Sequence, residues 1–210
     1  MLDNRYAIID IGTNTFHLII VDIQDGDFSI VRKERELVRL GLGGIDKKVI
    51  VPDAELRALR ALNSFHTLGK EHQVSAFFVY ATSAVRNASN KETFIKKVFD
   101  ETGLVIQVID GDREAELIYK GVKLGDGVLH PEPSLIIDIG GGSVEFIIAN
   151  EKERLWMQSF EIGGQRLKNM FHTVDPISKE ELDKLYQYLK DQLKPVLEAC
   201  LLYTSDAADD

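Results

Sequence analysis

The sequence contains one cysteine, Cys200, among 210 residues, which excludes a disulfide framework and a cysteine-based metal site. It contains no run of eighteen apolar residues, which excludes a transmembrane helix. The N-terminus carries charged residues before a short apolar run and has no small-residue cleavage site, so it lacks the pattern of a secretory signal. These absences predict a cytoplasmic protein that does not interact with a membrane.

An excess of positive charge is also missing. The formal net charge is −9 at pH 7, which argues against nucleic-acid binding because such domains usually present a basic face. It leaves an anionic ligand possible, since backbone N–H groups, a bound divalent cation and a few arginines hold phosphates locally. The hydrophobic content of 44% is sufficient for the cores of one or two domains.

The sequence does contain one phrase twice. "IIDIGTNTFHL" begins at Ile8 and "IIDIGGGSVEF" begins at Ile136. Each copy stands at the start of a pattern that predicts three strands joined by short turns and followed by helices. The repeated order indicates an internal duplication. The break between the copies falls in the glycine- and proline-rich segment "GDGVLHPEP", so we predict a first domain over residues 1–126 and a second over 127–199.

Other local patterns refine this prediction. "VSAFFVYA" is a continuous apolar run that predicts a strand buried on both faces. Apolar spacing predicts helices beginning at Pro52, over 112–124, over 164–171 and over 178–197. After this last helix, "CLLYTSDAADD" (200–210) resembles the translated read-through of a sequencing-library adapter. We therefore predict a non-native tail and a chain that is a fragment with an incomplete second domain.

The two repeated hairpins carry groups suited to phosphate. Gly12 and the three glycines at 140–142 allow the backbone to approach a ligand closely, and successive N–H groups in such turns bind anions. Asp10 and Asp138 end the preceding strands, where a carboxylate can hold a hydrated Mg²⁺ that bridges to a phosphate. Neither a Walker A loop nor a G-x-G-x-x-G fingerprint is present.

Four motifs together resemble one family. "DIGTNTFHL", "ATSAVRNA", "DGDREAELIYKGV" and "IIDIGGGSVEF", in this order, are similar to those of the exopolyphosphatase and guanosine pentaphosphate phosphohydrolase family, within the actin–sugar kinase–Hsp70 superfamily. The resemblance implies an α/β fold of duplicated RNase H-like (actin-like ATPase) domains with mixed five-stranded sheets flanked by helices. The second of these domains would be truncated here.

The resemblance also implies roles for individual residues. Glu114 matches the catalytic carboxylate that activates the attacking water; from the residues alone, Asp110, Asp112 and Glu116 fit an acidic helix start equally well. The family usually has a second acid where this chain has Arg113, and often a threonine where it has Val144. Residues matched to the metal are Asp138, Glu145 and Asp10. Residues expected to bind phosphate are Gly12, Thr13, Asn14, Thr15, Arg86, Gly140, Gly141, Gly142 and Ser143, and Gly163 resembles a third glycine turn of the family.

The implied activity is Mg²⁺-dependent release of terminal phosphate from inorganic polyphosphate, guanosine pentaphosphate or both, in a cleft between the two domains. Two alternatives stay open at this point. One is an ATP-dependent kinase of the same superfamily. The other is a sensor that binds polyphosphate or the alarmone without hydrolysis, which the departures from the family at Arg113 and Val144 leave open. Dimers are common in the resembled family, so a homodimer is a further expectation.

Overall fold

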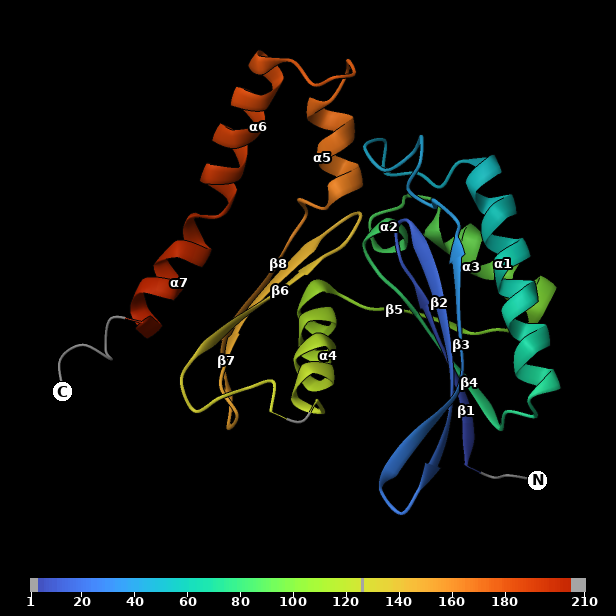
Figure 1. The fold of residues 1–210 in the computed structure, drawn as a ribbon. Helices are drawn as coiled ribbons and strands as arrows, with labels where there is room; N and C mark the ends of the chain where they lie inside the picture. Colours follow the sequence, from blue (N-terminus) through green and yellow to red (C-terminus); the bar gives the residue numbers. More distant parts are fainter. Residues whose placement is uncertain (1–3, 126, 205–210) are drawn as a thin grey trace. The chain divides into compact units, whose positions relative to one another are not determined.

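The computed structural model describes residues 4–125 and 127–204 (Figure 1). The chain forms two compact units, which divide between Ile109 and Asp110. This division lies earlier than the domain boundary expected at 126, because helix α4 (Gly111–Lys123) packs on the second sheet. None of the helices in the described ranges is both long and apolar enough to cross a membrane.

The first unit is built on a five-stranded sheet of order β3-β2-β1-β4-β5. Its strands are β1 (Arg5–Ile11), β2 (Thr15–Gln24), β3 (Asp27–Leu37), β4 (Ala76–Ala81) and β5 (Ile106–Val108). The first three are antiparallel neighbours, as predicted, whereas β4 and β5 run parallel to β1. Parallel neighbours require crossover connections, and helices provide them here.

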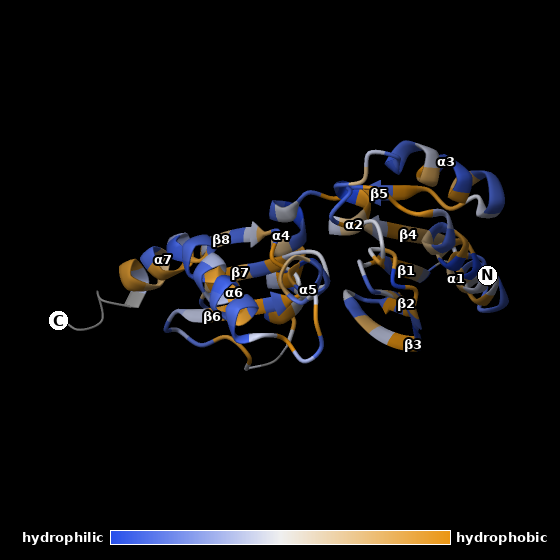
Figure 2. Cartoon of the chain, turned by 90° about the horizontal axis from the view of Figure 1, so that it is seen from above, coloured by the Kyte–Doolittle hydropathy of each residue, from blue (hydrophilic) through white to orange (hydrophobic). Residues whose placement is uncertain are grey.

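Three helices belong to this unit: α1 (Pro52–Glu71), α2 (Ser83–Arg86) and α3 (Lys91–Thr102). Pro52 suits the first helical position because its missing N–H has no partner there in any case. Gly103 ends α3 in a left-handed conformation, with φ 74°. Helices α1 and α3 lie on one face of the sheet (Figure 1), and both mix hydrophilic and hydrophobic residues (Figure 2), as amphipathic helices with one buried face do.

The prediction that β4 is buried on both faces was wrong. Val79 and Ala81 are buried under the helices, but Phe78 is 44% exposed. Its neighbour in register on β1, Ile8, is also partly exposed at 38%. The helices cover only one face of the sheet, so alternate residues of a continuous apolar run remain on the other face.

The second unit contains a three-stranded antiparallel sheet of order β6-β7-β8. Its strands are β6 (Ser134–Ile139), β7 (Val144–Ala149) and β8 (Arg154–Phe160). All residues of β7 are buried, because the two faces of this strand are covered by different helices. Ile147 and Ala149 pack with Ala115 and Tyr119 of α4, while Val144 and Phe146 belong to the core that includes Val196.

The predicted fold class is confirmed. The structure is a mixed α/β protein in which three antiparallel strands followed by helices occur twice. The helices that follow β8 are α5 (Gly164–Phe171), α6 (Lys179–Gln192) and α7 (Lys194–Thr204).

The predicted single helix over 178–197 is instead two helices, α6 and α7, and the second does not end near Ala199. The break lies at Leu193, just before Pro195, whose missing N–H cannot continue the hydrogen-bond ladder of α6. Helix α7 continues to Thr204, and the Tyr203 hydroxyl donates to the Leu155 carbonyl at 3.1 Å. Of the predicted non-native tail, residues 200–204 are therefore helical, and 205–210 lie outside the described residues.

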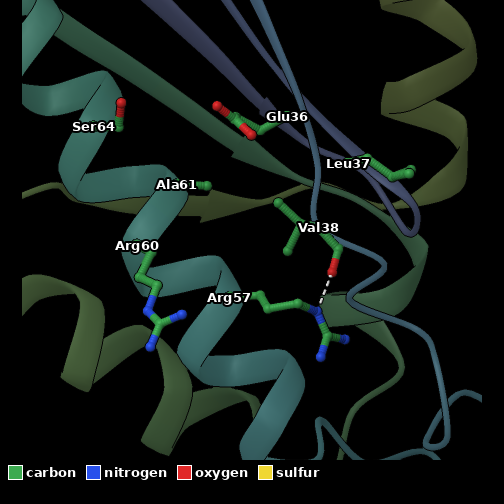
Figure 3. A pocket seen from close by; sticks show the side chains of 7 residues that line it. All are labelled: Glu36, Leu37, Val38, Arg57, Arg60, Ala61 and Ser64. Atoms are coloured by element: carbon green, nitrogen blue, oxygen red, sulfur yellow. Dashed lines mark hydrogen bonds between the residues drawn. The ribbon is translucent and has the colours of Figure 1, made fainter.

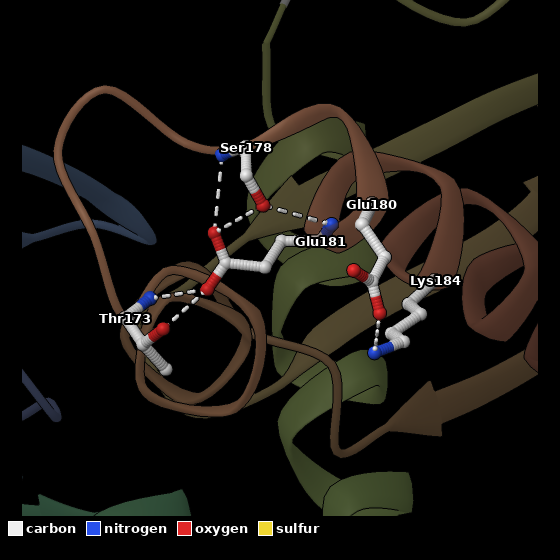
Figure 4. Close-up of polar contacts among 5 residues, drawn as sticks. All are labelled: Thr173, Ser178, Glu180, Glu181 and Lys184. Carbon is white, nitrogen blue, oxygen red and sulfur yellow. Dashed lines mark hydrogen bonds and ion pairs between the residues drawn. The ribbon is translucent and has the colours of Figure 1, made fainter.

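Helix α6 begins with a reciprocal capping arrangement (Figure 4). The Ser178 hydroxyl accepts from the Glu181 backbone N–H at 3.2 Å, and the Glu181 carboxylate accepts from the Ser178 N–H at 3.1 Å. The same carboxylate accepts from the backbone N–H of Thr173 at 2.9 Å and from its hydroxyl. Hydrogen bonds from Thr173 and Ser178 lower the pKa of Glu181 to about 2, so its charge ties the α5–α6 loop to the helix.

We expect Ser178→Ala to lower the free energy of unfolding by about 1 kcal/mol, because one backbone donor of α6 loses its acceptor. Thermal denaturation at neutral pH measures this change. Glu180→Gln is the matched control: it removes an exposed ion pair with Lys184 from the same helix (Figure 4) and should have a smaller effect. Equal melting temperatures for Ser178→Ala and wild type would contradict the capping role.

Candidate functional site

The two repeated hairpins have the same local construction. In the first unit the Gly12 N–H donates to the Thr15 carbonyl at 3.2 Å, and in the second the Gly140 N–H donates to the Ser143 carbonyl at 3.0 Å. A Cβ at Gly12 would lie 2.7 Å from the Thr15 oxygen, so a side chain there would obstruct the turn. The structural equivalence supports the duplication inferred from the sequence.

Residues of the first hairpin are partly enclosed. Thr13 is buried, and Asn14 and Thr15 are half-buried. Within the described residues, the side-chain oxygen Oδ1 of Asn14 is buried and accepts no hydrogen bond. A buried acceptor of this kind needs a donor from a ligand or from water. Asn14 is therefore the residue of this hairpin whose local chemistry points most directly to a ligand.

Helix α2 places Arg86 in the same unit as this hairpin. Strand β4 runs parallel to β1, so Thr82, directly after β4, lies beside the end of β1, and its N–H donates to the Ile11 carbonyl at 3.3 Å. Thr82 begins the single turn that ends at Arg86. The Arg86 guanidinium donates from Nη1 to the Ile109 carbonyl at 3.0 Å, which orients it at the carboxyl end of the parallel strands.

A row of polar side chains crosses the second sheet. Asp138 on β6 is directly opposite Glu145 on β7, and Glu145 is directly opposite Ser159 on β8. Directly opposed residues point to the same face of a sheet, so the three side chains share one face. Glu145 is only 1% exposed, whereas Asp138 is exposed. The Ser159 hydroxyl donates to Oε1 of Glu145 at 2.6 Å.

Helix α4 brings Glu114 to this row. Asp110 caps the helix by accepting the Arg113 N–H at 2.7 Å, and this places Glu114 in the first turn. Gly111 permits close packing on the sheet, since a Cβ there would lie 2.5 Å from the Ser159 Cβ. The charge of Glu114 acts on Glu145, so the predicted general base and one predicted metal ligand lie close together.

Burial raises the pKa of Glu145 to about 7, and the charges of Glu114 and Asp138 add to this effect. Hydrogen bonds from Ser159 and Ser143 act in the opposite direction. Glu145 thus binds a proton in the folded protein at pH values where the unfolded chain, with a pKa of about 4.5, has lost it. The free energy of unfolding consequently falls as the pH rises from about 4.5 to about 7.

We expect Glu145→Gln to stabilise the protein above pH 7, because glutamine keeps the shape and the acceptor for Ser159 but carries no charge. In EDTA, the variant should exceed wild type at pH 8 by as much as about 3 kcal/mol in free energy of unfolding. At pH 5 the difference should shrink to about 1 kcal/mol or less. Urea denaturation at both pH values measures it; a difference independent of pH would contradict the raised pKa.

Gly163, the third glycine turn, packs directly on the second hairpin. A Cβ at Gly163 would lie 2.4 Å from the Gly142 nitrogen and 2.5 Å from the Gly141 carbonyl carbon. The Gly163 N–H donates to the Gly142 carbonyl at 3.2 Å, and the Gln165 N–H donates to the Gly141 carbonyl at 2.9 Å. The backbone of the turn after β8 therefore supports the hairpin.

The structure groups the predicted site residues within each unit. Gly12–Thr15, Arg86 and the exposed Asp10 belong to the first unit; Glu114, Asp138, Glu145 and the 140–143 turn belong to the second. The predicted cleft between the units stays a prediction. Ser159 is a site residue that sequence reasoning missed, because its role depends on the β7–β8 register, and no local motif marks it.

The donor set of the second unit fits Mg²⁺. No group of three or more potential metal ligands occurs among residues 4–125 and 127–204. Mg²⁺, however, usually keeps several waters and takes one or two carboxylates together with substrate phosphates. Asp138 and Glu145 are such a pair, directly opposite each other on β6 and β7, and the pKa of Glu145 is raised mainly by burial, with the charges of Glu114 and Asp138 adding to it.

Two glycine hairpins, each at the end of a strand that carries an aspartate, define the class of duplicated α/β proteins. Within that class, this chain belongs to the Ppx/GppA phosphatase family, whose model matches residues 19–205.

The relatives agree with this assignment. A crystal structure of an exopolyphosphatase from Cytophaga hutchinsonii is 44% identical with a TM-score of 0.91, and the match covers 95% of this chain and 64% of that one. The Ppx/GppA enzyme of Aquifex aeolicus is 30% identical with a TM-score of 0.72, over 92% of this chain and 64% of that one. Exopolyphosphatase 2 of Mycobacterium tuberculosis is 32% identical over 202 residues, which are 92% of this chain and 63% of that protein. The chain thus spans less than two thirds of the length of these relatives.

Proposed function

We propose that this chain is the phosphate-binding and catalytic part of a Mg²⁺-dependent phosphohydrolase that releases terminal phosphate from inorganic polyphosphate or guanosine pentaphosphate. One arrangement carries the proposal: helix α4, with Glu114 in its first turn, packs through Gly111 against Ser159, which donates to Glu145 directly opposite Asp138, in the unit that contains the second glycine hairpin. A candidate base, a candidate metal site and a phosphate cradle thereby occur together. The family membership and the relatives named exopolyphosphatase support the substrate class.

Each group has a defined part in the proposed reaction. Glu114 accepts a proton from the water that attacks the terminal phosphorus. In the second unit the N–H groups of residues 140–143 hold phosphate oxygens and offset the charge that develops during transfer. In the first unit the hairpin N–H groups and the Arg86 guanidinium are further donors to phosphate. Asp138 and Glu145 would hold Mg²⁺, which supplies further neutralisation of the phosphate oxygens. Ser159 keeps the Glu145 carboxylate oriented.

A binding protein without hydrolysis is the second candidate, favoured by Arg113. Its guanidinium donates to Glu116 at 2.6 Å, so a cation stands directly before Glu114 where the resembled family usually has an acid. The charge beside the proposed base therefore differs from that in the resembled family.

The test measures phosphate release from polyphosphate and, separately, from guanosine pentaphosphate, with Mg²⁺ and with EDTA. The protein is produced at the length that its gene encodes, and binding of both ligands is measured by calorimetry. Release that requires Mg²⁺ supports the proposal, and the faster substrate identifies the specificity. Binding without release from either substrate would establish the sensor instead. Absence of both binding and release would overturn both candidates.

A further inference from the structure

The segment Val38–Gly41, which follows β3, forms two backbone hydrogen bonds with the first glycine hairpin. The Arg39 N–H donates to the Asn14 carbonyl at 2.7 Å, and the Gly41 N–H donates to the Thr13 carbonyl at 2.9 Å. Gly41 lies so close to the hairpin that a Cβ would stand 2.7 Å from the Thr13 methyl carbon. The backbone path of residues 13 and 14 thus depends on where this segment lies.

The segment adopts a conformation that needs support. Arg39 has φ 53°, in the left-handed region that residues with a Cβ rarely occupy. Residues in this region persist only where the surrounding structure fixes them. A specific contact must therefore hold the carbonyl groups of the segment in place.

Arg57 of helix α1 supplies that contact. Its Nε donates to the Val38 carbonyl at 2.7 Å, and Nη2 donates to the Arg39 carbonyl at 3.0 Å. Its Nη1 donates to the Asp53 carbonyl of its own helix at 3.1 Å. The planar guanidinium presents its donors in a fixed geometry, so it joins both carbonyls to α1 at once. Figure 3 shows Arg57 extending from α1 to the Val38 carbonyl.

The same guanidinium lines a hollow of about 230 Å³ between α1 and the end of β3 (Figure 3). Its lining residues are Glu36, Leu37, Val38, Arg57, Arg60, Ala61 and Ser64. Arg60, one turn further along α1, is exposed and extends away from Val38 (Figure 3). Solvent and small ions therefore have access to the place that the Arg57 guanidinium occupies.

In the second hairpin an arginine contacts the glycine turn itself. Nε of Arg166 donates to the Gly142 carbonyl at 3.1 Å, and its guanidinium also pairs with Glu161. An arginine from a following helix thus fixes the backbone of each glycine turn, directly in the second unit and through Val38–Gly41 in the first.

We propose that Arg57 is a positioning residue for the first phosphate-binding hairpin. Its guanidinium holds Val38–Gly41 in the left-handed turn, and that segment holds the Thr13 and Asn14 backbone in the form that accepts phosphate. The effect on phosphate rests on the proposed function, whereas the effect on the backbone does not.

Amide hydrogen exchange tests the backbone effect without any ligand. In Arg57→Ala, the Arg39 and Gly41 amides should exchange at least about tenfold faster than in wild type, because the segment that carries them is no longer held through its Val38 and Arg39 carbonyls. The amide of Val98, in the core of α3, should be unchanged, which separates local opening from global unfolding. Arg60→Ala is the matched control, since it removes a guanidinium from the same hollow, and it should exchange as wild type does.

Kinetics test the consequence for substrate. Arg57→Ala should raise the KM for polyphosphate about tenfold and change kcat by less than about threefold, because the hairpin binds phosphate and does not move protons. Guanidinium chloride at about 20 mM should restore part of the lost affinity in Arg57→Ala but not alter Arg60→Ala. Arg57→Lys keeps the charge and the aliphatic stem but loses the planar guanidinium that donates to two carbonyls at once. Its amide exchange and KM should therefore resemble those of Arg57→Ala.

Each outcome decides one part of the proposal. Wild-type exchange at Arg39 and Gly41 in both Arg57 variants would overturn it. Faster exchange with an unchanged KM would overturn the link to phosphate while leaving the backbone support. If wild type releases no phosphate, the proposed function fails, but the exchange measurements still decide the role of Arg57. If Arg57→Ala does not fold, Arg57→Lys provides the same comparison.

Discussion

Glu114→Gln is expected to reduce phosphate release by a factor of at least about 100 while changing polyphosphate affinity by less than about threefold. Glutamine fills the same space in the first turn of α4 but cannot accept a proton from water. Loss of the Glu114 charge also removes one cause of the raised pKa of Glu145, so binding of Mg²⁺ and substrate should be maintained. Steady-state phosphate release and calorimetric binding measure the two quantities separately.

Glu116→Gln provides the control for this change. Glu116 is on the same helix, but Lys120 and Arg113 hold its carboxylate in ion pairs and lower its pKa to about 2, so it is a poor base. Its variant should retain turnover within about threefold of wild type. A loss of activity of the same size in both variants would show that the helix, rather than the Glu114 carboxylate, is responsible.

The second large effect is expected for Gly163→Ala, which should weaken polyphosphate binding at least about tenfold and lower the free energy of unfolding by about 1–3 kcal/mol. The added methyl carbon would lie 2.4 Å from the Gly142 nitrogen. This clash is with backbone, which cannot relieve it by a change of rotamer. The hairpin or the turn after β8 must therefore move, and the phosphate-binding N–H groups of residues 140–143 move with it.

Gly164→Ala is the matched control, one residue further along. A Cβ at Gly164 has no neighbouring heavy atom within 4 Å, and the residue is the first of helix α5, where alanine is the better helix former. This variant should bind polyphosphate as wild type does and melt at the same or a higher temperature. Calorimetric binding and thermal denaturation of both variants decide the prediction; indistinguishable behaviour of the two would contradict it.

Much of the fold follows from local patterns in the sequence. The antiparallel start of each unit was predicted from apolar runs broken by turn residues, and the repeated Asp-Ile-Gly phrase located both hairpins. Helix α3 is capped by Gly103 in a left-handed conformation, which favours glycine. The break at Leu193 was missed although Pro195 signals it, since the apolar spacing continues through the break.

Local sequence patterns predicted less of the candidate site than of the fold. The motifs selected Glu114, but nothing in the sequence places it beside Glu145. That proximity depends on how closely α4 packs on β7 and β8, which Gly111 permits. The same holds for Arg57, which reads as an ordinary exposed residue of an amphipathic helix until its three acceptors are known.

The sequence by itself determined the antiparallel strands that begin each unit, the duplication and the two glycine hairpins, because turn chemistry and apolar periodicity act over a few neighbouring residues. Only the tertiary structure decided that Glu145 is buried with a raised pKa, that Ser159 orients it and that Arg57 supports the first hairpin. Burial, strand register and contacts between distant segments arise when the chain packs, so no local window of the sequence contains them.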